Sequence, residues 1–271
     1  MRLVTYVREG EPRAGSIEGD TVVDLGPSML EVLADGIGPA DGEAPRHALA
    51  DVRLLAPLPR PGKLLACAGN YQEHIAEGGG TAVDKGRAIP RLFIKPVTTV
   101  LAPGEPLRLP ALSRAVDWEL ELAAVIGRDG AVAGYAMLND VSARSIDWDV
   151  ERDLVEWDRF FDWLNGKWFD GFAPMGPWIA TPDEIADPND LKLELRVNGE
   201  VRQSASTSQM IFRVDELVAF ANRITTLEPG DVIATGTPAG VGAASHTYLE
   251  AGDVMEGTIE GLGVLRTPVV A

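Results

Sequence analysis

The sequence predicts an α+β protein in which β-strands dominate, and three observations support this. Alternating or apolar runs of strand length, such as residues 3–7, 21–25 and 193–197, recur between Gly, Pro, Asn and Asp residues. Clear helical spacing occurs at few places, and residues 214–224 form the best short helix. The length of 271 residues, with 45% hydrophobic residues, allows one large domain or a core domain with a small appendage.

The first strands indicate a small N-terminal β-rich domain over residues 1–58, followed by a larger domain over residues 59–271. Turn residues separate the strands predicted at 3–7 and 21–25. A proline-rich connection with Pro57, Pro59 and Pro61 follows, and it is a natural boundary. Residues 63–68 then form an apolar run with the length of a buried strand.

Residues 70–90 combine a polar helical turn with three consecutive glycines, Gly78, Gly79 and Gly80. Because glycine adopts many backbone conformations, such a run can act as a hinge. The segment therefore has two interpretations that stay open at this point, a mobile lid and an ordinary surface loop.

The most informative segment is residues 116–126, whose period of two indicates a strand inside a sheet. One face of this strand carries only acidic residues, namely Asp117, Glu119 and Glu121. The other face carries Trp118, Leu120 and Leu122. A partly buried carboxylate cluster needs a cation, and oxygen ligands suit Mg²⁺, Mn²⁺ or Ca²⁺. The alternative is a strand with a solvated acidic face.

Two further segments place polar residues after strands. Residues 134–144 end an apolar strand with a polar cluster in which Asp140 could be a third carboxylate ligand and Arg144 a cation for an anionic substrate. The glycine-rich residues 234–242 follow another strand and could hold a carboxylate with backbone N–H groups. They lack the lysine of a nucleotide-binding P-loop.

The remaining elements are a hairpin, a turn and an acidic helix. Asn198-Gly199 after residues 193–197 is a strong hairpin signal, and residues 254–270 alternate in places. Residues 228–231 form a turn before the short apolar run at 232–234. An amphipathic helix with an acidic outer face is predicted within residues 147–162, because four apolar residues recur at helical spacing: Leu154, Trp157, Phe161 and Leu164. This Trp-rich segment, 147–168, either packs on the core or forms an aromatic wall over a pocket.

Charge and composition exclude several functions. With 24 Lys and Arg against 41 Asp and Glu, the net charge of −17 argues against partners such as nucleic acid or an anionic membrane. One cysteine, Cys67, and three histidines exclude a disulfide framework and a Cys-rich or His-dominated metal site. Cys67 lies in an apolar strand and is expected to be inert. There is no apolar segment of signal-peptide or membrane-span length, so we expect a cytoplasmic protein.

Six motifs occur in order between about residues 60 and 265. They are Gly69-Asn70-Tyr71 with His74 and Glu77, residues 93–96, residues 117–122, residues 139–144, residues 166–170 and residues 236–242. This ordered set resembles the fumarylacetoacetate hydrolase superfamily. The resemblance implies a rolled mixed β-sheet like a distorted barrel, a homodimer, and a Mg²⁺ or Mn²⁺ cofactor, for which Ca²⁺ could substitute.

The resemblance also implies roles for individual residues. Glu119, Glu121 and Asp140 would be the metal ligands, and Asp117 would not be one. His74 and Glu77 would form a lid dyad, in which Glu77 orients His74 as the general base.

Other residues would contact the substrate. Lys167 would stabilise an oxyanion, and Arg144 and Thr237 would hold the substrate. Tyr71 and Lys95 are further substrate-binding candidates, and a supporting role for Lys95 is equally open. Asn70 stands about where some family members place an additional acidic ligand, and Ser145 and Asp147 also depart from the acylpyruvase pattern.

The function that the resemblance implies is metal-dependent hydrolysis of a C–C bond in a small 2,4-dioxo acid, such as an acylpyruvate. Water activated by His74 and Glu77 would attack, and a metal-stabilised enolate would leave. The first alternative keeps the site but changes the reaction to oxaloacetate decarboxylation or keto–enol tautomerisation. The second is a non-catalytic protein that binds a metabolite. In each case the expected partner is a small anionic keto acid.

Overall fold

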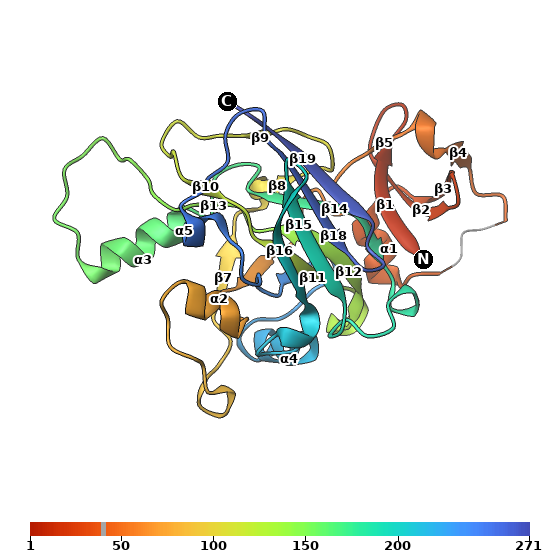
Figure 1. Cartoon of the computed structure of the whole chain (residues 1–271). Coiled ribbons are helices and arrows are strands. Elements are labelled where there is room, and N and C mark those ends of the chain that lie inside the picture. Colours follow the sequence, from red (N-terminus) through yellow and green to blue (C-terminus); the bar gives the residue numbers. More distant parts are fainter. Residues whose placement is uncertain (39–41) are drawn as a thin grey trace.

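The computed structural model describes residues 1–38 and 42–271 (Figure 1). Across these residues the strands form a 12-stranded sheet, a five-stranded sheet and a two-stranded sheet. The mainly β, α+β fold class predicted from the sequence is confirmed.

The 12-stranded sheet joins the N-terminal strands to the strands of the site. From edge to edge its order is β4 (Arg46–Ala48), β3 (Thr21–Gly26), β2 (Arg13–Glu18), β1 (Arg2–Val7), β14 (Ala173–Ala180), β12 (Val132–Asn139), β11 (Leu120–Ile126), β17 (Val232–Ala234), β6 (Leu64–Cys67) and β7 (Leu92–Lys95), with β5 (Arg53–Leu54) beside β1 and β8 (Val100–Leu101) beside β14. Because β1 pairs antiparallel with β14, the N-terminal strands continue the same sheet. The division at residues 58 and 59 stays a prediction.

The five-stranded sheet lies against the large one. Its order is β16 (Glu200–Ser206), β15 (Lys192–Val197), β18 (Val254–Ile259), β19 (Val264–Val270) and β9 (Leu107–Arg108), and the small sheet pairs β10 (Val116–Asp117) with β13 (Ser142–Ala143). The predicted hairpin joins β15 to β16. Its turn residues Asn198 and Gly199 have φ angles of 52° and 81°, as a two-residue hairpin turn requires.

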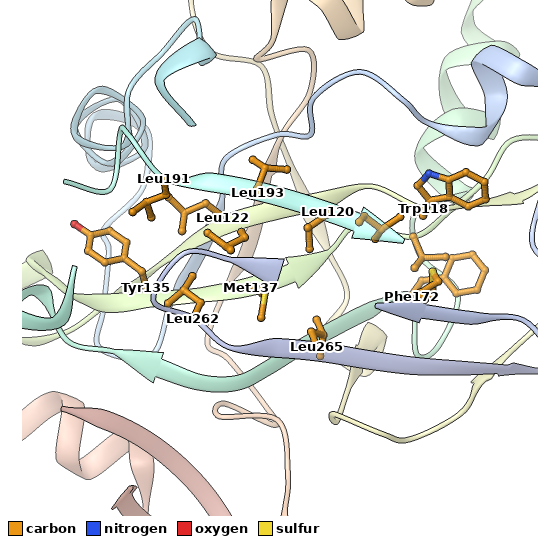
Figure 2. Close-up of a cluster of buried hydrophobic side chains, with 14 of the residues drawn as sticks. Trp118, Leu120, Leu122, Tyr135, Met137, Phe172, Leu191, Leu193, Leu262 and Leu265 are labelled. Atoms are coloured by element: carbon orange, nitrogen blue, oxygen red, sulfur yellow. The ribbon is translucent and has the colours of Figure 1, made fainter. Parts of the chain in front are cut away.

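The main hydrophobic core lies between these two sheets (Figure 2). Leu120 and Leu122 of β11 face Leu193 of β15 and Leu265 of β19 there. The intervening residues of β11, such as Ala123, pack in a second core on the opposite face of the large sheet. Strand β11 is therefore buried on both faces, and a polar side chain on it must find its partners inside the protein.

The helices are short. They are α1 (Met29–Asp35), α2 (Gln72–Glu77), α3 (Glu156–Asn165), α4 (Val214–Ile224) and α5 (Gly242–Ser245), with single 3₁₀ turns η1 (Leu49–Asp51), η2 (Lys85–Arg87), η3 (Val97–Thr99), η4 (Arg128–Gly130), η5 (Pro182–Glu184) and η6 (Thr207–Gln209). Helix α4 has the predicted bounds, and it buries Leu217 and Ala221, while Ile224 in its last turn is exposed. Within residues 1–38 and 42–271, no helix has the length and apolar character needed to cross a membrane.

Helix α3 corrects one prediction. It begins at Glu156, so Leu154 precedes it, and none of its residues is buried. Trp157 is 68% exposed and Phe161 is 49% exposed, so the interpretation that this face packs on the core is wrong. The physical reason is that Trp157, Phe160 and Phe161 pack on one another, and the helix projects from the body of the protein (Figure 1, green). Trp163, in the second half of the helix, is half-buried and packs on Phe93.

Candidate metal and substrate site

Three carboxylates predicted as metal ligands meet at one end of two paired strands. Glu121 lies in β11, Glu119 precedes that strand, and Asp140 follows β12. The antiparallel register places Leu120 opposite Asn139, and the Asp140 N–H donates to the Glu119 carbonyl at 2.8 Å. The three side chains are buried, and each offers one oxygen within 4.8 Å of the other two.

Two buried lysines and the half-buried Arg144 pair with two of these carboxylates. Lys167 Nζ lies 2.6 Å from Glu119 Oε2 and 2.8 Å from Asp140 Oδ2. Lys95 also donates to Asp140, and Arg144 Nη2 lies 2.5 Å from Glu119. Burial by itself would raise the pKa of Glu119, but Lys167 and Arg144 outweigh it and lower that pKa to about 2.

Glu121 has a different environment. The Gly236 N–H donates to Glu121 Oε2 at 2.7 Å, and in the described part of the chain no Lys or Arg forms an ion pair with this carboxylate. Burial, and then the charges of Asp140 and Glu119, raise the pKa of Glu121 well above its ordinary value. A buried carboxylate without a cation, beside two others, fits a hard divalent ion with oxygen ligands. Glu119, Glu121 and Asp140 would hold that ion.

Asp117 lies in β10, and its carboxylate has different partners from those of the three clustered acids. It accepts hydrogen bonds from Gly242 N–H at 2.6 Å and Ala243 N–H at 2.9 Å. It also accepts one from Arg144 Nε at 2.7 Å. Asp117 and Glu119 together fix the Arg144 guanidinium at the edge of the cluster.

The glycine-rich residues 234–242 do hold carboxylates, and these belong to the chain itself. Backbone N–H groups of this loop donate to three acids: Gly236 to Glu121, Gly240 to Glu77 and Gly242 to Asp117. A side chain at Gly240 would approach the Arg202 carbonyl to 2.0 Å, so only glycine fits there. The loop therefore fixes acids from distant parts of the sequence.

The predicted dyad is present on α2. His74 Nδ1 lies 2.7 Å from Glu77 Oε1, and Glu77 Oε2 accepts from the Gly240 N–H at 2.8 Å. Glu77 thus orients the ring and ties α2 to the glycine-rich loop. Because Nδ1 is engaged, Nε2 is the nitrogen left for proton transfer.

These groups surround a small cavity of about 90 Å³. Seven residues predicted for the site line it: His74, Glu119, Glu121, Asp140, Arg144, Lys167 and Thr237. Lys167 reaches the cavity because it follows the last turn of α3, where Gly166 packs against the Ala143 backbone.

Two predicted substrate-binding residues do not reach the wall of this cavity. Tyr71 is buried in the main core, and its hydroxyl has no hydrogen-bond partner among the described residues. Lys95 is fully buried behind Asp140. The location of Lys95 matches the supporting role that the sequence also allowed.

The sequence did not single out two aromatic residues that line the cavity, Phe93 and Trp163. Their ring centroids lie 5.1 Å apart. Phe93 lies in one of the six motifs, so the sequence could have indicated it as a site residue. Trp163 is one of several aromatic residues in its segment, and nothing in the sequence distinguished it from the others. Asn70 is a structural residue: its amide donates to the Phe212 and Thr235 carbonyls.

The side chains that line this cavity indicate the class of protein to which the chain belongs. Oxygen ligands for a hard cation beside an acid–base histidine are typical of metal-dependent enzymes. A family model described as fumarylacetoacetate (FAA) hydrolase C-terminal matches residues 63–270, and one described as Rv2993c-like, N-terminal, matches residues 1–57. The chain belongs to the fumarylacetoacetate hydrolase family, as the resemblance predicted.

Individual relatives carry enzyme names. A Bos taurus protein named oxaloacetate tautomerase FAHD2A, mitochondrial, is 38% identical over 300 residues, covering 100% of this chain and 92% of its own. A solved structure of 5-carboxymethyl-2-hydroxymuconate delta-isomerase from Mycobacterium smegmatis has a TM-score of 0.80 and 36% identity, covering 100% and 99% of the two chains. Maleylpyruvate hydrolase from Sphingobium sp. SYK-6, solved with manganese(II) and pyruvate, has a TM-score of 0.77 and 31% identity, covering the same shares.

Proposed function

We propose that this protein is a divalent-metal-dependent enzyme that interconverts the keto and enol forms of small 2-oxo acids, with oxaloacetate as the first substrate to test. The observation that carries the proposal is that His74 lines the same cavity as the carboxylate cluster and two cations, Arg144 and Lys167. The names of relatives such as the Bos taurus tautomerase support the same reaction.

Binding of an anionic substrate would depend on local charge, because the chain carries a net charge of −17. Arg144 and Lys167 are held rigidly by their carboxylate partners, so they present fixed positive charge to the cavity. A divalent ion held by Glu119, Glu121 and Asp140 would add Lewis-acid polarisation of the 2-oxo group.

The proposed step is a proton transfer by His74. Its Nε2 takes a proton from the carbon next to the 2-oxo group, and the C–H electron pair forms the C=C bond. The carbonyl π pair moves to oxygen, where Lys167 stabilises the negative charge. The protonated His74 then returns its proton to that oxygen, which completes the enol. Glu77 holds the His74 ring and stabilises its charged form throughout.

C–C hydrolysis of an acylpyruvate, the reaction predicted from the sequence, is the second candidate. Its support is the similarity to a maleylpyruvate hydrolase whose structure contains manganese(II) and pyruvate. In this reaction Nε2 of His74 would take a proton from water and not from carbon. Decarboxylation of oxaloacetate would use the same enolate and need no water.

One set of assays separates these reactions. Loss of the enol absorbance of oxaloacetate measures tautomerisation, and coupled pyruvate release measures decarboxylation or, with acylpyruvates, hydrolysis. Each assay is run with Mg²⁺, Mn²⁺ or EDTA. We expect metal-dependent loss of enol absorbance that His74→Ala abolishes and His47→Ala, in β4, preserves. Pyruvate release without faster tautomerisation would overturn the proposal, and ligand binding without any turnover would favour the non-catalytic alternative.

A further inference from the structure

A second cavity adjoins the one that contains the carboxylate cluster. It has a volume of about 330 Å³ and lies between residues 142–146 and the segment that leads into and includes α3. Arg144 and Trp163 line both cavities. The two cavities therefore share part of their walls, and a ligand bound beside the carboxylates would lie next to the second cavity.

The second cavity is lined by two arginines besides Arg144, namely Arg152 and Arg159. Arg152 there forms an ion pair with Asp162 at 2.5 Å and lies 6.0 Å from the centre of the Trp148 ring. Arg159 also lines the cavity, and across residues 1–38 and 42–271 no carboxylate lies within 4.0 Å of its guanidinium. The negative charge of Asp162 is thus balanced by Arg152, whereas Arg159 remains available to an anion.

The wall of the second cavity is partly apolar. Ile146 and Leu154 line it, and Trp163 lines both cavities. A short hydrocarbon chain would lie against these side chains, and a carboxylate at its far end would reach the arginines. A guanidinium binds a carboxylate through two parallel hydrogen bonds, which favours arginine for this purpose.

We propose that this second cavity is a subsite for the distal carboxylate of a 2-oxo dicarboxylate, and that Arg159 is its specificity-determining residue. The inference rests on the proposed function, because it places the 2-oxo acid end of the ligand beside the carboxylate cluster. It gives a function to the acidic, Trp-rich segment 147–168, in which Arg152 pairs with Asp162 and Arg159 lines the second cavity. The substrates would then be 2-oxo dicarboxylates with chains longer than that of oxaloacetate.

The test uses matched pairs of 2-oxo acids that differ only in the distal carboxylate. 2-Oxoglutarate, 2-oxoadipate and 2-oxopimelate are each compared with the 2-oxo monocarboxylate of the same length. Affinity for the Mg²⁺-loaded full-length protein is measured by calorimetry, which does not require turnover. We expect one dicarboxylate at least to bind about tenfold more tightly than its partner, the size of one charge-assisted hydrogen-bonded contact. Arg159→Gln should remove this preference, and Arg159→Lys should restore part of it.

Controls separate this inference from the proposed function. Arg223→Gln, on the exposed face of α4, should leave the preference unchanged. Absence of oxaloacetate tautomerisation in the wild type would count against the proposed function alone. Equal affinity for both members of every pair, or a preference that survives in Arg159→Gln, would overturn the subsite.

Discussion

At the scale of single residues, the ammonium group of Lys167 forms ion pairs with two of the three clustered carboxylates. Its Nζ contacts both Glu119 and Asp140, and burial of the amine is offset by these charges, which raise its pKa. Removing any member of such a buried group leaves its neighbours with one partner fewer, and breaking a buried ion pair costs about 3–5 kcal/mol. The same residues are therefore expected to matter for stability and for metal binding.

Glu119→Gln tests the carboxylate cluster. The change removes one anionic oxygen from the ligand set and leaves Arg144 and Lys167 short of a partner. We expect Mn²⁺ affinity measured by calorimetry to fall more than about a hundredfold, and the free energy of unfolding to fall by about 3–5 kcal/mol. Glu260→Gln, at an exposed turn, should change neither quantity. Wild-type Mn²⁺ affinity in a folded Glu119→Gln protein would contradict the assignment.

Cys67 gives a pH-dependent prediction. Burial, and then the charge of Glu121, raise the pKa of its thiol to about 12. Because the thiolate is the reactive form, alkylation of the native protein at pH 8 should be far slower than that of the unfolded chain. The rate should keep rising with pH above the ordinary thiol pKa, as measured with iodoacetamide and mass spectrometry. Rapid native alkylation that levels off near pH 9 would show that the thiol is not buried as described.

At the scale of elements, the position of α2 depends on one carboxylate. Glu77 contacts both His74 and the backbone of Gly240. Glu77→Gln keeps a hydrogen-bond acceptor for Gly240 but removes the charge that stabilises protonated His74. We expect kcat for the enolisation reaction to fall about 10–100-fold with Mn²⁺ affinity unchanged. Glu73→Gln, on the same helix, is the control, and a fall in both variants would indicate a general loss of helix order.

The contrast between α4 and α3 shows what local patterns can predict. The bounds of α4 and the Asn198-Gly199 hairpin follow from spacing and turn chemistry within a few residues. The apolar spacing in α3 is just as typical of a helix. Whether other parts of the protein cover its aromatic face depends on the tertiary fold, and spacing within one helix carries no information about that. The carboxylates were predictable as a group because Glu119 and Glu121 share a strand face. The backbone partners of Glu121 and Asp117 in residues 234–242 lie more than a hundred positions away, so no local signal identified them.

At the scale of the whole molecule, the site depends on the core between the two large sheets. Side chains of this core pack against one face of β11, the strand that carries Glu121. Leu265 of β19 is 2% exposed in this core, whereas its neighbour Val264 is 53% exposed. Leu265→Ala should lower the free energy of unfolding by about 2–5 kcal/mol in denaturant titrations, because it leaves a cavity. Val264→Ala should change it by less than about 1 kcal/mol. Equal effects would mean that the sheets do not pack as described.

The assembly and the domain boundary stay predictions. The homodimer implied by the family resemblance would give twice the chain mass of 29.0 kDa in sedimentation equilibrium. Residues of a single chain line both cavities. The proposed reaction therefore does not depend on whether the protein is a homodimer.

The most direct test of the central claim is hydrogen–deuterium exchange at the methyl group of pyruvate, followed by NMR in D₂O with Mg²⁺. Pyruvate is the smallest 2-oxo acid with an exchangeable C–H, and its enolisation is common to the tautomerase, decarboxylase and hydrolase reactions. The account predicts exchange well above the uncatalysed rate in the wild type, and loss of that exchange with EDTA or in His74→Ala. Exchange at the uncatalysed rate in the wild type, or unchanged exchange with EDTA, would contradict it.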